Sequence, residues 1–168
     1  IEESDIGIKD SKILAIGNLQ NKKYKNKIDA KNLLIMPGAI DSQVHFREPG
    51  LTHKEDIFCG TRGAVLGGIT TIFEMPNTNP QTTNKEALDE KLKIADKHAH
   101  CNYSFFMGAA KENIEKLGEL ERIEECCGVK IFMGSSTGDL LVEDDESLKK
   151  ILSNICLLYT SDAADDGL

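Results

Sequence analysis

The sequence predicts an α/β fold: the first half of a TIM-type (β/α)8 barrel, preceded by a few strands that cannot form a core alone. Apolar strand-like segments alternate with helix-like segments from residue 37 to residue 155. The segments before residue 37 alternate apolar and polar residues, as half-buried strands do, and are too few to enclose a core. Polar residues gather where the predicted parallel strands end, which is where barrels of this kind carry their sites.

Residues 1–36 begin with a predicted hairpin over residues 5–17. Ile6 and Ile8 alternate with small or polar residues, Asp10-Ser11 is typical of a turn, and a second apolar strand follows. A further short strand is expected to end at Ile28, after a basic loop. These few strands cannot form a core alone.

Residues 37–155 repeat a strand followed by a helix. Leu88, Leu92 and Ala95 form an apolar stripe at helical spacing, and residues 83–86 fit a capping box before it. Gly67-Gly68 is a suitable end for the preceding helix. The predicted strands cover residues 39–46, 69–75, 102–108 and 128–134, and the predicted helices cover residues 53–67, 84–99, 111–126 and 144–154.

Residues 156–168 fit neither a strand period nor a helix period. They resemble the translation of a transposon-end sequencing adapter, so we expect a non-native tail. The alternative is an ordinary irregular polar terminus.

Composition excludes several classes of function. The chain has 168 residues and a net charge of -8, which disfavours a nucleic-acid partner. No apolar run reaches the ~20 residues that a membrane helix needs. The five cysteines show no CxxC spacing, which favours reduced thiols and a cytoplasmic location.

The first predicted barrel strand carries the strongest candidate site. Gln43, His45 and Arg47 should share one face of it, and Pro49-Gly50 ends it. A lone strand histidine is usually a hydrogen-bonded core residue, but an arginine on the same face favours a metal ligand, and imidazole suits zinc. Arg47 could pair with a neighbouring glutamate or hold a substrate carboxylate in a bidentate fork.

Asn77 and Lys130 lie at or near the ends of later strands. By its sequence context alone Asn77 is typical of a turn, since Asn and Pro cluster in loops. Lys130 stands between residues that should be buried, where an ammonium group is costly and the amine is freer to react. His98 and His100 resemble a metal pair, but they precede a strand and therefore fall at the opposite, structural face of a barrel.

Residues 37–50, 74–80 and 128–134 resemble, in order, the first, second and fourth barrel strands of dihydroorotases in the amidohydrolase superfamily. The resemblance covers residues 1–155 and implies that residues 1–36 are strands of a small, here incomplete, β-sandwich. It also implies reversible hydrolysis of dihydroorotate to N-carbamoyl-aspartate in pyrimidine biosynthesis. It implies one or two zinc ions held by His45 and Lys130, with Lys130 carboxylated to bridge two metals. It also implies that Arg47 and Asn77 bind the substrate carboxylate.

Gln43 departs from the family's His-x-His pair and resembles a Gln-x-His subgroup. An amide is a poorer zinc ligand than imidazole, so the number of metals is left open. The remaining ligands and the proton-shuttling aspartate belong to strands absent from this sequence. We therefore expect no catalytic residue within the chain, no activity from it alone, and an open sheet edge that favours a homo-oligomer.

Two alternatives remain. The first is an allantoinase-type or dihydropyrimidinase-type hydrolase acting on another cyclic amide. The second is a non-catalytic subunit that scaffolds an aspartate transcarbamoylase partner, for which Gln43 is the supporting feature.

Overall fold

A computed structural model describes residues 3–136, 140–156 and 159–162, the last four as backbone only. The chain divides into two compact units, residues 1–36 and residues 37–168. Each unit is described by itself.

The first unit contains one β-hairpin. Strand β1 (Asp5–Lys9) pairs antiparallel with β2 (Lys12–Gly17), as predicted. Asp10 and Ser11 connect them with φ values of 51° and 59°, the left-handed pair that a tight hairpin turn requires. The strand expected to end at Ile28 does not form, because no neighbouring strand in this unit accepts its backbone hydrogen bonds. The prediction for that segment was wrong.

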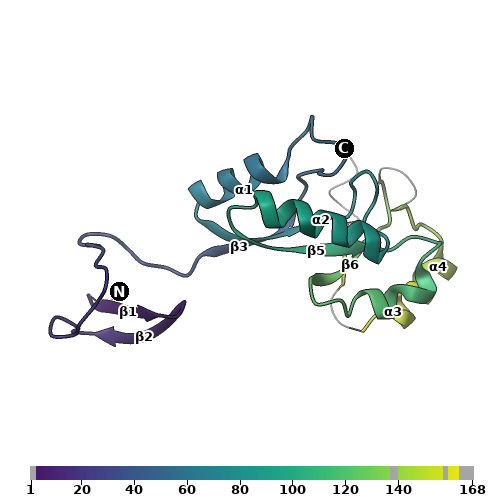
Figure 1. The fold of residues 1–168 in the computed structure, drawn as a ribbon. Helices are drawn as coiled ribbons and strands as arrows, with labels where there is room; N and C mark the ends of the chain where they lie inside the picture. Colours follow the sequence, from purple (N-terminus) through teal and green to yellow (C-terminus); the bar gives the residue numbers. More distant parts are fainter. Residues whose placement is uncertain (1–2, 137–139, 157–158, 163–168) are drawn as a thin grey trace. The chain divides into compact units, whose positions relative to one another are not determined.

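The second unit is built on a curled parallel sheet, half of a barrel (Figure 1). The four predicted strands are confirmed, the first ending two residues earlier than expected and the last beginning two residues earlier. A fifth strand forms inside the segment expected to be irregular, so that expectation was wrong for four residues. In sheet order the strands are β3 (Ala39–Val44), β4 (Ile69–Glu74), β5 (Asn102–Gly108), β6 (Cys126–Phe132) and β7 (Tyr159–Asp162).

Three capped helices cover the outer face of the sheet: α1 (Ile57–Leu66), α2 (Lys85–His98) and α4 (Asp145–Asn154). The side chains of Asp56, Asn84 and Asp144 each accept a hydrogen bond from the backbone N–H three residues later. Because Asp56 is the cap, α1 begins at Ile57 rather than near residue 53.

The helix predicted over residues 111–126 is wrong. The segment holds only the short 3-10 helix η1 (Ile114–Lys116) and α3 (Leu117–Leu120). The buried Asn113 side chain explains the late start: its Oδ1 accepts from Ala110 N at 2.9 Å, and its Nδ2 donates to the carbonyl of Gly108 at 2.8 Å. These bonds hold residues 110–113 as a turn.

The core lies between the sheet and the helices. Val129 and Ile131 of β6 pack there with Leu88 of α2 and Ile151 of α4. Strand side chains alternate, so Lys130 must lie on the opposite, concave face. The rings of Phe73 and Phe106, 6.3 Å apart, occupy the same concave face on β4 and β5. The concave face is the one that would line a barrel.

Candidate active site at the strand ends

Two loops dock at the carboxyl ends of β3 and β4, namely residues 45–50 and residues 75–80. Met75 N donates to Val44 O, and Asn79 N donates to Pro49 O, both at 3.0 Å. Gly50 has a φ of 86°, and a Cβ placed on it would lie 2.0 Å from Asn79 O. Only glycine therefore lets the two loops approach this closely.

His45 and Asn77 meet across these loops. His45 Nδ1 lies 2.9 Å from Asn77 Oδ1, and Asn77 is 3% exposed. With Nδ1 donating to the amide oxygen, the neutral ring carries its lone pair on Nε2. A hydrogen bond of this kind orients a metal-ligating imidazole and selects its tautomer.

Arg47 joins the same cluster by an unexpected route. Because β3 ends at Val44 and Arg47 has a φ of 68°, strand alternation does not place its side chain, and that part of the prediction was wrong. Arg47 Nη1 nevertheless donates to the backbone carbonyl of Asn77 at 3.3 Å. The guanidinium and the Asn77 amide group thus supply N–H donors of the type that a carboxylate accepts.

Lys130 comes from β6, two strands beyond β4, and is fully buried. Its Nζ lies 4.9 Å from the centre of the Phe132 ring. The register pairs between neighbouring strands run from Val44 to Glu74, from Glu74 to Phe105, and from Phe105 to Cys126. The strands of an eight-stranded barrel with a shear number of about 8 are tilted. Residues at one height along the barrel axis therefore lie about one position further along each successive strand than the register partners do. Three strands beyond His45, the residue at the same height along the barrel axis is therefore close to Lys130.

The donor set is compatible with zinc. Imidazole nitrogen is a common zinc ligand, and a carboxylated lysine would offer oxygen. Three strand spacings of about 4.8 Å separate β3 from β6 along the sheet, and curling shortens the direct path between their inward side chains. His45 is half-buried in the loop that follows β3, whereas Lys130 is fully buried on the concave face of the sheet. Gln43, also half-buried, lies on β3 two residues before His45.

Sequence reasoning missed a buried ion pair beside this cluster, between Glu74 at the end of β4 and Lys91 of α2. Both side chains are almost wholly shielded from solvent. Burial raises the pKa of Glu74, an effect that Lys91 opposes, and burial lowers the pKa of Lys91. The signal was present: Lys91 falls within the apolar stripe between Leu88 and Ala95.

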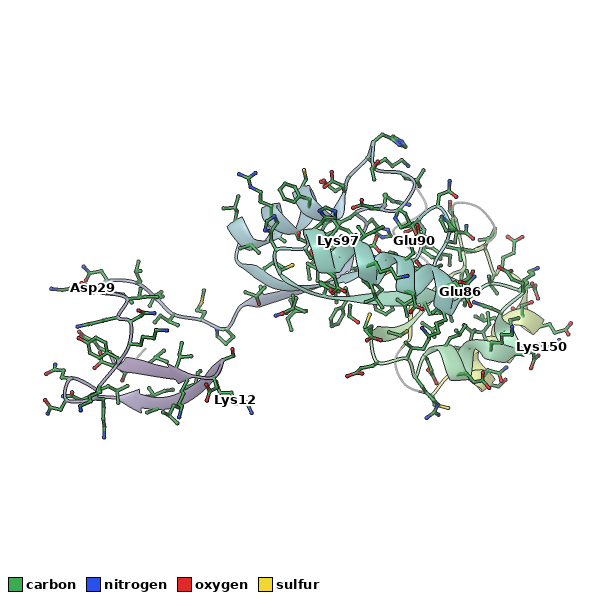
Figure 2. The ribbon with its side chains drawn as sticks, viewed as in Figure 1. Lys12, Asp29, Glu86, Glu90, Lys97 and Lys150 are labelled. Atoms are coloured by element: carbon green, nitrogen blue, oxygen red, sulfur yellow. The ribbon has the colours of Figure 1, made fainter. Side chains whose placement is uncertain are left out.

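Figure 2 shows the ordinary arrangement of charges on α2, where Glu86, Glu90 and Lys97 lie on its exposed side. Lys91, by contrast, lies on the buried side, against the sheet. A charge so placed is retained only with partners that compensate it.

A second group of metal-capable side chains lies at the start of α1: Glu55, Asp56 and Cys59. Within the described residues it is the one group of three or more such side chains with mutually close ligand atoms. Asp56 already caps the helix there, and Cys59 is exposed. His98 is the last residue of α2, and His100 lies between α2 and β5. Both precede β5 and therefore fall at the amino end of that strand, opposite the loops above, as expected.

None of the helices in the described part of the chain combines the length and the apolar character needed to cross a membrane. All five cysteines are free thiols.

Comparison with known proteins gives a consistent family. The family model described as "Dihydro-orotase-like" matches residues 32–138. A dihydroorotase of Methanosarcina mazei is 37% identical over 171 aligned residues, covering 100% of this chain and 37% of that protein. An allantoinase of Rubrobacter xylanophilus is 38% identical over 149 residues, covering 88% of this chain and 33% of that protein.

Among solved structures, the L-hydantoinase (dihydropyrimidinase) of Arthrobacter aurescens superposes with a TM-score of 0.82 at 30% identity. The match covers 89% of this chain and 34% of that one. The chain therefore spans little more than a third of the length of the relatives that it matches.

Proposed function

This chain belongs to the dihydro-orotase-like family, and we propose that the protein of which it forms part hydrolyses dihydroorotate to N-carbamoyl-aspartate. The observation that carries this choice of substrate is the contact of Arg47 with Asn77 beside His45. Two groups of N–H donors converge where the strands end, and a carboxylate-bearing cyclic amide fits them. A substrate without a carboxylate leaves the guanidinium without its counter-ion.

His45 and Lys130 are the residues that would hold metal in this protein. The chemistry that zinc supplies in such a site is polarisation of the amide carbonyl and activation of water. Asn77 keeps the His45 imidazole in the tautomer that exposes Nε2 as a ligand. The burial of Lys130 beside Phe132 supports carboxylation of its amine, and the carbamate would present two oxygens to metal.

Gln43 limits the strength of that site. Its amide stands where the resembled family has an imidazole, two residues before His45, which favours one tightly held metal over two. The further ligands and the proton-shuttling carboxylate would come from the barrel strands that account for the greater length of the relatives. We expect this chain alone to lack hydrolase activity and the complete protein to work in the cytoplasm.

A second candidate function is a scaffold for aspartate transcarbamoylase that binds no metal, and Gln43 is the observation that favours it. An allantoinase-type activity is the alternative within the enzyme class, since a relative of that name is 38% identical.

Purified complete protein, assayed for zinc content and for turnover of dihydroorotate, allantoin and hydantoin, separates these candidates. We expect bound zinc and a clear preference for dihydroorotate. Preference for allantoin or hydantoin would assign the site to an uncharged cyclic amide. Absence of both zinc and turnover would favour the scaffold.

A further inference from the structure

The buried Glu74–Lys91 ion pair sits directly behind the cluster of His45, Arg47 and Asn77. Glu74 is the last residue of β4, and Asn77 follows it by three residues. Lys91 reaches this point from α2, and both side chains are excluded from solvent. A lysine and a glutamate at such depth are costly, so their position calls for a physical reason.

Lys91 holds the end of β4 by three contacts. Its Nζ pairs with Glu74 Oε2, donates to the backbone carbonyl of Met75 at 3.0 Å, and lies 5.0 Å from the centre of the Phe105 ring. The Met75 carbonyl belongs to the peptide that leads into Pro76 and Asn77. The ammonium group therefore fixes the direction in which the chain leaves the strand.

Glu74 also lies beside the start of the neighbouring loop of residues 45–50. Val44 of β3 is the register partner of Glu74, and Met75 N donates to Val44 O at 3.0 Å. Burial raises the pKa of the Glu74 carboxyl, and first Lys91 and then Arg47 of the neighbouring loop oppose that rise. One buried pair thus lies against the start of both loops.

We propose that Glu74 and Lys91 are positioning residues for the substrate-carboxylate site. They hold the loops of residues 45–50 and 75–80 in register, so that Arg47 and Asn77 face one anion and His45 keeps its hydrogen bond to Asn77. They touch neither substrate nor metal. The catalytic part of this inference rests on the proposed function, and the structural part does not.

The test uses the complete protein with the double variant Glu74→Leu/Lys91→Met. Replacing a buried ion pair by apolar residues of similar volume commonly preserves folding, so the loops can be examined in a folded protein. Lys91→Met alone is the second variant, because Glu74 can then become neutral by taking up a proton. The control is Lys85→Ala/Asp89→Ala, which removes an exposed ion pair from the same helix, with side chains 59% and 38% exposed.

Two measurements are made on each variant. Hydrogen exchange followed by mass spectrometry should show about tenfold faster exchange in peptides covering residues 45–50 and 75–80, with the rest of α2 unchanged. Steady-state kinetics should show a KM for dihydroorotate raised about tenfold, with a smaller change in kcat. The control should match the parent in both measurements.

The outcomes are distinct. Unchanged exchange of both loops in the double variant and in Lys91→Met overturns the inference, whatever the substrate is. Faster exchange with an unchanged KM also overturns the positioning role. If the parent does not turn over dihydroorotate, the proposed function fails, and the exchange experiment still decides whether the pair holds the loops.

Discussion

Gly50→Ala should be among the most damaging single-methyl changes in the described part of the barrel. Gly50 has a φ of 86°, and a side chain in left-handed conformation costs about 1–2 kcal/mol. Its new Cβ would lie 2.0 Å from Asn79 O and 2.6 Å from Asn79 Cβ, so the loops must separate. Such overpacking costs about 1–3 kcal/mol. The hydrogen bond from Asn79 N to Pro49 O, now 3.0 Å, would be strained or lost, which adds about 1 kcal/mol.

The expected loss is therefore about 4 kcal/mol in the free energy of unfolding, measured by urea denaturation of the complete protein. The matched control is Gly63→Ala in α1, where a Cβ meets nothing within 4 Å. That change should stabilise the helix by about 0.5–1 kcal/mol. A Gly50→Ala protein whose unfolding free energy equals that of the parent, or of Gly63→Ala, would refute the close docking of the two loops.

Three further predictions concern the site and one surface tyrosine. Arg47→Met should raise the KM for dihydroorotate about 10- to 100-fold, because it removes a charged donor to the substrate carboxylate. Any turnover of an uncharged hydantoin should change little, and equal losses on both substrates would contradict a carboxylate-binding role for Arg47. His45→Asn and Lys130→Met should each lower the zinc content of the purified complete protein by at least about tenfold, and metal analysis showing full occupancy in either variant would remove that residue from the ligand set. Burial and a hydrogen bond to Asp96 raise the pKa of Tyr103 to about 12 from an ordinary value of 10. Between about pH 10 and pH 12 the folded protein therefore keeps the Tyr103 hydroxyl proton that the unfolded chain loses. Its free energy of unfolding should fall over this range more steeply than that of Tyr103→Phe. Identical pH profiles of the two proteins would contradict the raised pKa.

Much of the fold could be predicted because the sequence follows strand and helix periods over long stretches. Leu88, Leu92 and Ala95 mark α2 clearly, and all four barrel strands of the prediction form. The third predicted helix failed because a single buried asparagine, Asn113, uses its side chain to hold a turn that periodicity does not reveal.

Part of the site could also be predicted. His45, Arg47 and Asn77 do lie together, and Lys130 lies buried on the concave face of the same sheet. The route of Arg47 could not be foreseen, because the strand stops at Val44 and the backbone turns into left-handed conformation. The roles of these residues as ligands of metal and substrate stay predictions.

The Glu74–Lys91 pair escaped notice for a different reason. A lysine on a helix is usually exposed to solvent. Only the three-dimensional structure shows that Lys91 of α2 points toward the sheet and pairs with Glu74 of β4. Its spacing from Leu88 and Ala95 was the available signal. A charged residue in phase with an apolar stripe is therefore worth testing for a buried partner.

The central claim is that His45, just after strand β3, and Lys130, on strand β6, share one metal site at the carboxyl ends of the sheet. A crystal structure of the complete protein grown with zinc, with the metal located by anomalous scattering, tests it most directly. We predict zinc about 2.0–2.1 Å from His45 Nε2 and bound to a carboxyl group carried on Lys130 Nζ. Zinc located only at Glu55, Asp56 and Cys59, or an unmodified Lys130 remote from the metal, would contradict the claim.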